Sequence, residues 1–542
     1  MPFDASTPMR VKRTSFGQKA KAQNFRSSKG ELGSAAASAR AGNRLSRAER
    51  TGTLSGAAAR GSAAYEGISR GGVGRSGGAR SSGARGSYNG SNARAGHEVG
   101  HHSSQEQVNL LRQRREGQAG TITKTVRPPR RKEITPKRVS HKPGFTTFQL
   151  RLVNSILTSA LVDGKPLDKA YALWFAKVKL PQTEQGFVIS HINAMFRRLS
   201  FYAQVAGLKR PSDFKRHVNF LILAYYVAQG WPEPELNAEG FDRSGITKRL
   251  KEAQEHPLLR EGCPYWLEEL GSRELKDAWP AERKALGEAA KRFIRVNTLK
   301  TTRDELASRL TQEGVVTRSV KGVATALEVT SNSALFRTEA FREGLFEQQD
   351  PGSQEIAPFL QVEPGMRVID ACAGAGGKTL HLAALMQNKG TLIALDIEQW
   401  KLDDLRKRAS RAGVFNVEVR LIDSTKVIKR LYDHADRVLI DAPCSGLGVL
   451  RRTADSKWAD LNPRLVELKK VQADILERYS RMVKVGGKVV YSTCSILPSE
   501  NQAQVQAFLA AHSDSFKLEE EKVILPSSGF DGFYMARLVR LA

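Results

Sequence analysis

The stretch DACAGAGGKT, residues 370–379, decides the fold of this chain. It follows MRVID, Met366 to Asp370, a short run with β-branched residues that predicts a buried strand. Its glycines allow a turn too tight for side chains, and TLHLAALMQ then has apolar residues at helical spacing. A second apolar strand, Thr391 to Leu395, ends at Asp396. This order predicts a Rossmann-like unit that holds a nucleoside-containing cofactor, with Asp396 binding the ribose hydroxyls.

The glycine spacing narrows the choice of cofactor. A phosphate-binding P-loop needs Gly five residues before Gly377, where the chain has Cys372. A dinucleotide fingerprint that begins at Gly374 needs Gly at position 379, where the chain has Thr379. Both mismatches favour a nucleoside without a phosphate, such as S-adenosylmethionine. The alternative that this loop has only a structural role and binds no cofactor stays open at this point.

Charge is concentrated at the N-terminus. The net charge is +29 over 542 residues, and residues 1–150 hold 28 Lys and Arg against 8 Asp and Glu. Residues 1–143 are rich in Gly, Ser, Ala and Arg and poor in aromatics, so we expect a disordered basic tail. Spaced Arg residues favour an RNA-binding arm, with a solubilising tail or an organellar transit peptide as alternatives. We expect no membrane span, because no run of about 20 apolar residues occurs.

The four cysteines are Cys263, Cys372, Cys444 and Cys494. They form no CxxC pair and no Cys/His cluster with zinc spacing, so we expect no metal site. A disulfide framework is typical of small secreted domains, and this chain is large. Reduced, intracellular thiols are therefore expected.

Three further domains are predicted after the tail. Residues 144–240 carry several apolar runs at helical spacing and predict an all-helical domain. Residues 241–345 predict a small mixed α+β subdomain, and 346–542 an α/β catalytic domain in which strands and helices alternate. In the helical domain, an RNA-facing patch and a solvated helix face explain equally well a group of basic residues: Arg197, Arg198, Lys209, Arg210, Lys215 and Arg216.

Reactive side chains follow the predicted strands of the catalytic domain. Ligands bind beyond the carboxyl ends of strands in open α/β sheets, and five residues occupy such ends: Asp396, Asp423, Asp441, Cys444 and Cys494. The two cysteines lie in Pro-Cys-Ser-Gly and Thr-Cys-Ser sequences, which are typical of loops. This context favours reactive thiols over buried, inert ones.

Thiols at such a site fit one difficult reaction. Carbon 5 of a pyrimidine is a poor nucleophile until a thiolate adds to carbon 6, and a base must later remove the proton from carbon 5. One cysteine is then the nucleophile and a second assists release. The ring must be unstacked, as in single-stranded or flipped RNA.

From about Trp266 to Ala542 the chain resembles the RNA 5-methylcytosine methyltransferases of the Nol1/Nop2/Sun (RsmB-like) family. The matching segments are RVNTLK at 295–300, QDPGSQ at 349–354, DACAGAGGKT at 370–379, DAPCSGLGVLRR at 441–452, KW at 457–458, STCSILPSEN at 492–501 and DGFYMARL at 531–538. The resemblance implies a class I S-adenosylmethionine-dependent methyltransferase core. It also places residues 144–240 where bacterial members carry a NusB-like RNA-binding domain, although the likeness there is loose.

The resemblance also implies roles for single residues. Cys494 is the expected nucleophile and Cys444 the thiol that helps release. The expected cofactor residues are Cys372, Ala373, Gly374, Ala375, Gly376, Gly377, Lys378, Asp396, Asp423 and Asp441. Among them, Asp423 is expected near the adenine, Asp441 between cofactor and base, and Lys378 near the base or the cofactor carboxylate.

The sequence departs from the family pattern at two places, and one competing assignment exists. Ala375 replaces a Pro, and Thr453-Ala454 replace the more usual Asn-Pro; neither change removes a reacting group. Cytosine methyltransferases that act on DNA use a Pro-Cys nucleophile at the position of Cys444. The Thr-Cys-Ser loop favours Cys494 instead.

The sequence therefore predicts an enzyme that methylates carbon 5 of a cytosine in RNA, with rRNA favoured over tRNA. We expect a monomeric, cytoplasmic protein, and the choice between a bacterial cytoplasm and an organelle stays open. An RNA-binding ribosome-assembly factor that uses the fold as a scaffold is the alternative. A P-loop ATPase is disfavoured by Cys372.

Overall fold

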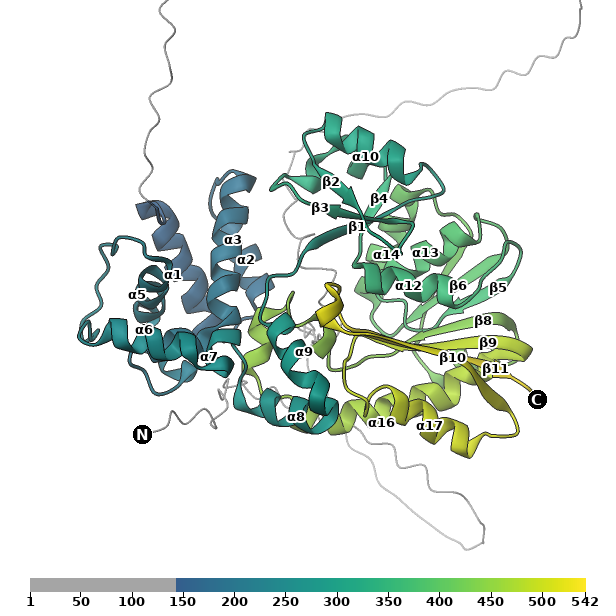
Figure 1. Ribbon diagram of the computed structural model, residues 1–542. Helices are drawn as coiled ribbons and strands as arrows, with labels where there is room; N and C mark the ends of the chain where they lie inside the picture. The colour runs from purple at the N-terminus through teal and green to yellow at the C-terminus, as the bar shows by residue number, and fades with distance from the viewer. Residues whose placement is uncertain (1–142) are drawn as a thin grey trace, which may run out of the picture. The chain divides into compact units, whose positions relative to one another are not determined.

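The computed structural model describes residues 143–542. The predicted tail, apart from Pro143, lies outside these residues. The described part contains a bundle of helices, a four-stranded sheet and a seven-stranded sheet (Figure 1). Within residues 143–542, no helix is both long enough and apolar enough to cross a bilayer.

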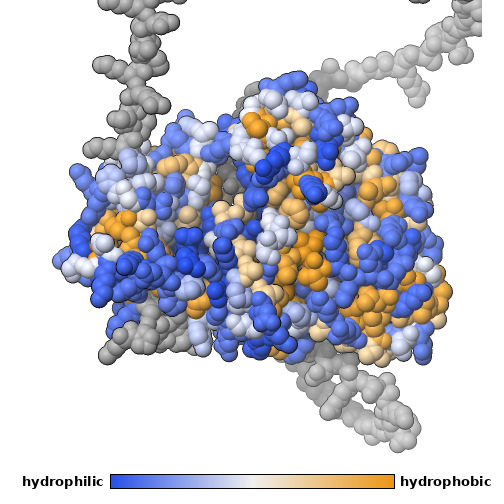
Figure 2. Space-filling view, in the orientation of Figure 1, coloured by the Kyte–Doolittle hydropathy of each residue, from blue (hydrophilic) through white to orange (hydrophobic). Residues whose placement is uncertain are grey.

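The helical bundle begins directly after the tail. Its helices are α1 (Thr147–Leu161), α2 (Leu167–Phe175), α3 (Gln182–Arg197), α4 (Leu199–Val205), α5 (Val218–Gln229), α6 (Ile246–Glu255) and α7 (Pro257–Glu261). Thr146 caps α1 in a reciprocal pair with Gln149, and α5 buries seven of its twelve residues. The core continues past the predicted end at residue 240, because Ala253 and Leu259 pack in it. Helix α6 buries only Ala253, and its outer surface is hydrophilic (Figure 2).

Helices α8 (Tyr265–Leu275) and α9 (Trp279–Leu286) lead into a small antiparallel sheet. Its order is β2-β3-β1-β4, with bounds β1 (Arg292–Val296), β2 (Thr317–Ser319), β3 (Ala326–Val329) and β4 (Phe346–Gln348). Helices α10 (Arg303–Gln312) and α11 (Glu339–Arg342) lie between its strands in sequence. Strands β1, β2 and β3 lie within the predicted α+β subdomain, and β4 lies just beyond its predicted boundary at 345.

The seven-stranded sheet has the order β10-β11-β9-β8-β5-β6-β7. Its strands are β5 (Arg367–Asp370), β6 (Thr391–Asp396), β7 (Val417–Leu421), β8 (Ala435–Asp441), β9 (Val483–Thr493), β10 (Phe516–Ile524) and β11 (Phe533–Arg540). The strands from β9 to β7 in this order pair in parallel, whereas β11 pairs antiparallel with β9 and β10. The predicted α/β fold class is confirmed.

Helices cover both faces of this sheet. They are α12 (Pro351–Phe359), α13 (Gly377–Leu385), α14 (Gln399–Ala412), α15 (Thr425–Lys429), α16 (Asn462–Tyr479) and α17 (Gln502–Ala511). Val368 of β5 shares a core with α12, α13 and α14, and the next residue, Ile369, shares a core with α15, α16 and α17. This alternation explains why the parallel strands are apolar on successive positions. Because β5 lies between β6 and β8, the chain order reverses there, and such a switch point opens a crevice at the carboxyl ends of the strands.

A short segment after β8 connects the catalytic domain to the bundle. Trp458 is 7% exposed, belongs to the core of the bundle, and donates its indole N–H to the carbonyl of Phe196 at 2.5 Å. The neighbouring Lys457 donates to the carbonyl of Leu286 at 2.8 Å and accepts from the indole of Trp266 at 3.0 Å through its carbonyl. The KW pair is therefore a structural connection between three parts of the chain.

We predict that Trp458→Ala destabilises the protein by about 3–5 kcal/mol, the usual cost of removing a buried Trp side chain. Circular dichroism during denaturant unfolding measures this change. The control is Val466→Ala on α16, where the side chain is 51% exposed and a change of about 0.5 kcal/mol or less is expected. Equal unfolding midpoints for the two variants would contradict the assignment of Trp458 as a connector.

Candidate active site

The glycine-rich loop joins β5 to α13 at the carboxyl end of the sheet. Gly374 and Gly376 have φ values of +56° and +92°, in the left-handed region that favours glycine. A Cβ atom at Gly376 would lie 2.7 Å from Cγ of Leu405, so the loop also packs closely on α14. The backbone N–H of Gly374 donates to Oδ2 of Asp396 at 2.9 Å. The loop is thus tied to the end of β6.

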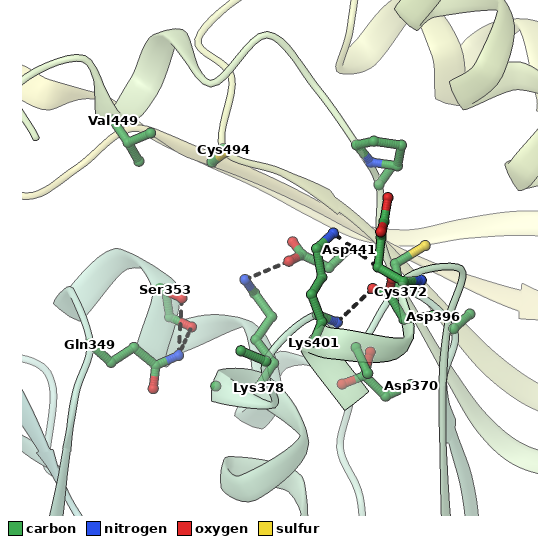
Figure 3. Close-up of a pocket in the computed structure, with 18 of the residues that line it drawn as sticks. Gln349, Ser353, Asp370, Cys372, Lys378, Asp396, Lys401, Asp441, Val449 and Cys494 are labelled. Atoms are coloured by element: carbon green, nitrogen blue, oxygen red, sulfur yellow. Dashed lines mark hydrogen bonds and ion pairs between the residues drawn. The ribbon is translucent and has the colours of Figure 1, made fainter. Parts of the chain in front are cut away.

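A cavity of about 390 Å³ lies at this crevice. Its lining includes the glycine-rich loop, the carboxylates of Asp396 and Asp441, and the side chains of Lys378 and Cys494. In Figure 3, Cys494 lies on one side of the view and Asp396 on the other, with Lys378 and Asp441 between them. The cavity therefore has a thiol near one part of its wall and an acidic strand end at another.

An ion pair stands in the middle of the cavity. Nζ of Lys378 lies 2.7 Å from Oδ2 of Asp441, and the hydroxyl of Ser492 donates to Oδ1 of the same carboxylate at 3.0 Å. Burial by itself would lower the pKa of Lys378, but the charge and hydrogen bond of Asp441, with smaller contributions from Cys494 and Asp370, together raise it. Lys378 therefore stays charged at neutral pH, and its position is fixed by Asp441.

Asp370 is buried beneath the loop. Its Oδ2 accepts from the hydroxyl of Thr379 at 2.7 Å, whereas Oδ1 is buried with no hydrogen-bond partner among residues 143–542. Burial raises the pKa of Asp370 to about 7. A buried carboxylate oxygen without a partner, in the wall of a cavity, is suited to a donor group on a ligand.

The two predicted cysteines meet. Sγ of Cys444 lies 3.2 Å from Sγ of Cys494, and both are free thiols. Cys494 is partly exposed and lines the cavity, whereas Cys444 is only 2% exposed and lies behind it. The hydrogen bond to Cys494, together with burial, raises the pKa of Cys444 well above its ordinary value. The two thiols are therefore adjacent but not equivalent.

The structure brings most of the predicted site residues together. Those that line the cavity are Cys372, Ala373, Gly374, Ala375, Gly377, Lys378, Asp396, Asp441 and Cys494. Three lie outside the lining: Gly376 packs on Leu405, Cys444 lies behind Cys494, and Asp423 is exposed beyond the end of β7, where Ile422 lines the cavity instead. Among residues 143–542, no group of three or more Asp, Glu, His or Cys side chains is arranged to hold a metal ion.

Sequence reasoning missed a charged cluster at the wall of the cavity. Arg452 pairs with Asp350 at 3.0 Å and also contacts Asp531, and the backbone N–H of Asp531 donates to Asp350 at 3.1 Å. Burial and the nearby Asp531 raise the pKa of Asp350 to about 6. All three residues lie in the segments that carry the resemblance, but nothing in their spacing predicts that they meet. Glu500, which contacts both cysteine loops, was missed in the same way.

Comparisons with known proteins point to one family. A family model described as 16S rRNA methyltransferase RsmB/F matches residues 357–539, and the ferredoxin-like domain of RsmF/B-like methyltransferases matches residues 263–335. The ribosomal RNA small subunit methyltransferase B of Serratia proteamaculans is 30% identical over 318 residues, covering 55% of this chain and 72% of that protein. The probable ribosomal RNA small subunit methyltransferase B of Synechocystis is 35% identical over 223 residues.

The extent of these matches differs. The alignment with the Synechocystis protein covers 41% of this chain and 50% of that relative, so the chain spans only half of its length. A solved structure, that of the protein PH0851, superposes with a TM-score of 0.61 at 23% identity, and it covers 74% of this chain and 100% of that one. That superposition shows the same fold.

We predict that Asp370→Asn changes the pH dependence of stability. The pKa of Asp370 is about 7 in the folded protein, above the ordinary value of 3.8, so the stability that its protonated form contributes is lost as pH rises toward and through 7. The thermal midpoint of the Asn variant, relative to that of the unsubstituted protein, should therefore increase between pH 5 and pH 8.

The control for this measurement is Asp304→Asn on α10, where the side chain is 89% exposed. Its midpoint should follow that of the unsubstituted protein across the same pH range. Parallel curves for Asp370→Asn would show that the buried carboxylate does not titrate in this interval.

Proposed function

Because the chain belongs to the RsmB/F methyltransferase family, we propose that it transfers a methyl group from S-adenosylmethionine to carbon 5 of a cytosine in RNA. The resemblance to RsmB-like Nol1/Nop2/Sun methyltransferases, predicted from the motifs, is confirmed. The relatives are named as methyltransferases of small-subunit ribosomal RNA. Ribosomal RNA of the small subunit is therefore the substrate we propose for this chain.

One observation carries the proposal. Two free thiols lie 3.2 Å apart, and one of them opens into a cavity that also contains the glycine-rich loop and Asp396. Methyl transfer to oxygen or nitrogen requires no thiol nucleophile, whereas carbon 5 of a pyrimidine does require one. The thiol pair thus supports carbon 5 as the acceptor.

The residues of the cavity fit S-adenosylmethionine. Both oxygens of Asp396 already accept one backbone N–H, from Gly374 and Glu398, and each retains a lone pair for the ribose hydroxyls. The unpartnered Oδ1 of Asp370 suits the amino group of the methionine part. When bound there, the cofactor supplies an electrophilic methyl group.

Cys494 begins the reaction on the base. Its thiolate adds to carbon 6, the electron pair of the ring double bond moves to carbon 5, and carbon 5 accepts the methyl group. Lys378 faces this site and favours the negative charge that develops there, since it is held in place by Asp441. Asp441 is itself oriented by Ser492.

Cys444 acts in the release step. The proton on carbon 5 is removed, its bonding pair restores the double bond to carbon 6, and the bond from carbon 6 to the Cys494 sulfur breaks. The thiol of Cys444 lies 3.2 Å from that sulfur, so it can pass its proton to the departing thiolate and take up the proton from carbon 5. One proton then leaves to solvent for each methyl group transferred.

We predict that Cys494→Ala abolishes methylation, with a loss of at least about 10³-fold, because only Cys494 of the two paired thiols lines the cavity. The assay follows radiolabelled methyl transfer to small-subunit RNA, and bisulfite sequencing identifies the modified cytosine. Calorimetry should show unchanged cofactor binding. Near-normal methylation by this variant would refute the nucleophile assignment, and absent methylation by the unsubstituted protein would favour an assembly-factor role.

We predict that Cys444→Ala leaves the attack intact and traps a covalent complex with RNA. The variant lacks the thiol that assists release, so the bond between Cys494 and carbon 6 persists after methyl transfer. Denaturing gel electrophoresis with labelled RNA detects the complex. Its absence from the double variant Cys444→Ala/Cys494→Ala is the matching control, and a complex that survives in the double variant would contradict the scheme.

A further inference from the structure

The two cysteine loops have the same local construction. Each cysteine is followed by a serine, Ser445 or Ser495, and each serine hydroxyl accepts from the backbone N–H two residues later. These two bonds, from Leu447 and Leu497, measure 3.3 Å and 3.1 Å. Since each serine oxygen already accepts, its hydroxyl proton is free to donate elsewhere.

Both hydroxyls donate to one carboxylate. Ser445 donates through its hydroxyl to Oε2 of Glu500 at 2.5 Å, and Ser495 donates to the same oxygen. The other oxygen, Oε1, accepts from the backbone N–H of Ser445 at 2.8 Å and from the amide of Gln472 at 3.0 Å. Gln472 also donates to the carbonyl of Pro443 at 3.0 Å. Glu500 therefore joins the two loops through hydrogen bonds to both.

Glu500 is fully buried, and these four donors are neutral groups. The four lone-pair sites of a carboxylate, two on each oxygen, match these four donors. Such a network, when every member is satisfied, holds its parts in one geometry. The geometry held here is the one that sets the two sulfur atoms 3.2 Å apart.

The charges around the thiols are also unequal. Lys378 lies on the side of Cys494 and interacts electrostatically with it. Glu500 has no direct bond to either sulfur, but its carboxylate binds the residue next to Cys444 through both N–H and hydroxyl, and its charge contributes to the raised pKa of Cys444. The negative charge near Cys444 disfavours a thiolate there.

We propose that Glu500 is a positioning residue that fixes the two cysteine loops together and whose charge distinguishes the two thiols by keeping Cys444 in its thiol form. The assignment of a chemical role to this difference rests on the proposed function. The difference itself is a property of the protein without RNA or cofactor. It can therefore be measured independently of methylation.

The test measures thiol alkylation by iodoacetamide at pH 9 in the full-length chain, with each cysteine followed by peptide mass spectrometry. Glu500→Gln is placed in two backgrounds, Cys494→Ala and Cys444→Ala, so that one active-site thiol is observed at a time. Loss of the carboxylate charge should accelerate alkylation of Cys444 by roughly threefold to tenfold, because the thiolate fraction rises while the lower pKa makes each thiolate somewhat less nucleophilic. Alkylation of Cys494 should change by less than about threefold, since Glu500 binds the Cys494 loop only through the Ser495 hydroxyl, whereas Lys378 interacts electrostatically with Cys494 itself.

Two further variants separate charge from packing. Glu500→Asp keeps the charge but shortens the side chain, so it loosens the loops without removing the negative field, and Cys444 should keep its slow alkylation. Glu282→Gln is the matched control: Glu282 is 1% exposed and accepts from the backbone N–H of Ser527 at 2.9 Å, a residue outside both cysteine loops. It should leave both alkylation rates unchanged.

Each outcome decides the proposal. If Glu500→Gln leaves the alkylation rate of Cys444 unchanged, the charge has no influence on that thiol and the proposal is wrong. If Glu500→Asp accelerates Cys444 as much as Glu500→Gln does, loosened packing explains the effect and the proposal is also wrong. Should Glu500→Gln not fold, as judged by circular dichroism, a Glu500→Asp variant that does fold supports the need for a carboxylate between the two loops, and fast alkylation of Cys444 in that variant contradicts the proposal. A methylation failure of Cys494→Ala or of the unsubstituted protein bears on the proposed function alone.

Discussion

The parallel pairing of β8 with β9 is the constraint on which the site depends. In its register Asp441 lies opposite Ser492, and the chain leaves the two strands at Ala442 and Thr493. The loops that follow therefore start side by side, and Cys444 and Cys494 come within 3.2 Å although 50 positions separate them in the sequence. A shift of one residue in this register would turn Asp441 to the opposite face and separate the ion pair with Lys378 from the thiols.

Local sequence patterns, such as an apolar strand that ends in an acidic residue, were sufficient to predict part of the site. Buried parallel strands are nearly continuous apolar runs, so an acid that ends such a run, as Asp396 and Asp441 do, marks the edge where ligands bind. The same reasoning failed for side-chain direction at Asp423. Strand β7 ends at Leu421, and two residues further on the chain has left the sheet, so Ile422 faces the cavity and Asp423 faces solvent. Periodicity stops at the last residue of a strand.

Contacts between distant segments could not be predicted in this way. Trp458 packs among helices 262 positions earlier in the chain, and Arg452 joins Asp350 to Asp531 across 181 positions. Nothing in the neighbouring sequence identifies these partners, because their packing is decided only when β8, α12 and β11 have assembled.

The predicted domain boundary at residue 240 could not be corrected from sequence for a similar reason. Helices α6 and α7 follow a Pro- and Glu-rich stretch that resembles a linker, yet they complete the core of the bundle. The amino-acid composition of a segment does not show whether that segment packs in a hydrophobic core.

Two thiols are chemically identical until their surroundings distinguish them. Cys494 is partly exposed with Lys378 on its side, and Cys444 is buried next to the loop that Glu500 binds. The electrostatic cost of this arrangement is limited, because Lys378 is paired with Asp441 and Glu500 is surrounded by donors. A shared proton between two equivalent thiols would give each sulfur the same share of negative charge. With a cation beside one sulfur and a carboxylate beside the loop of the other, the two sulfur atoms lie in different electrostatic surroundings, and the sulfur beside the cation is the one that faces the cavity.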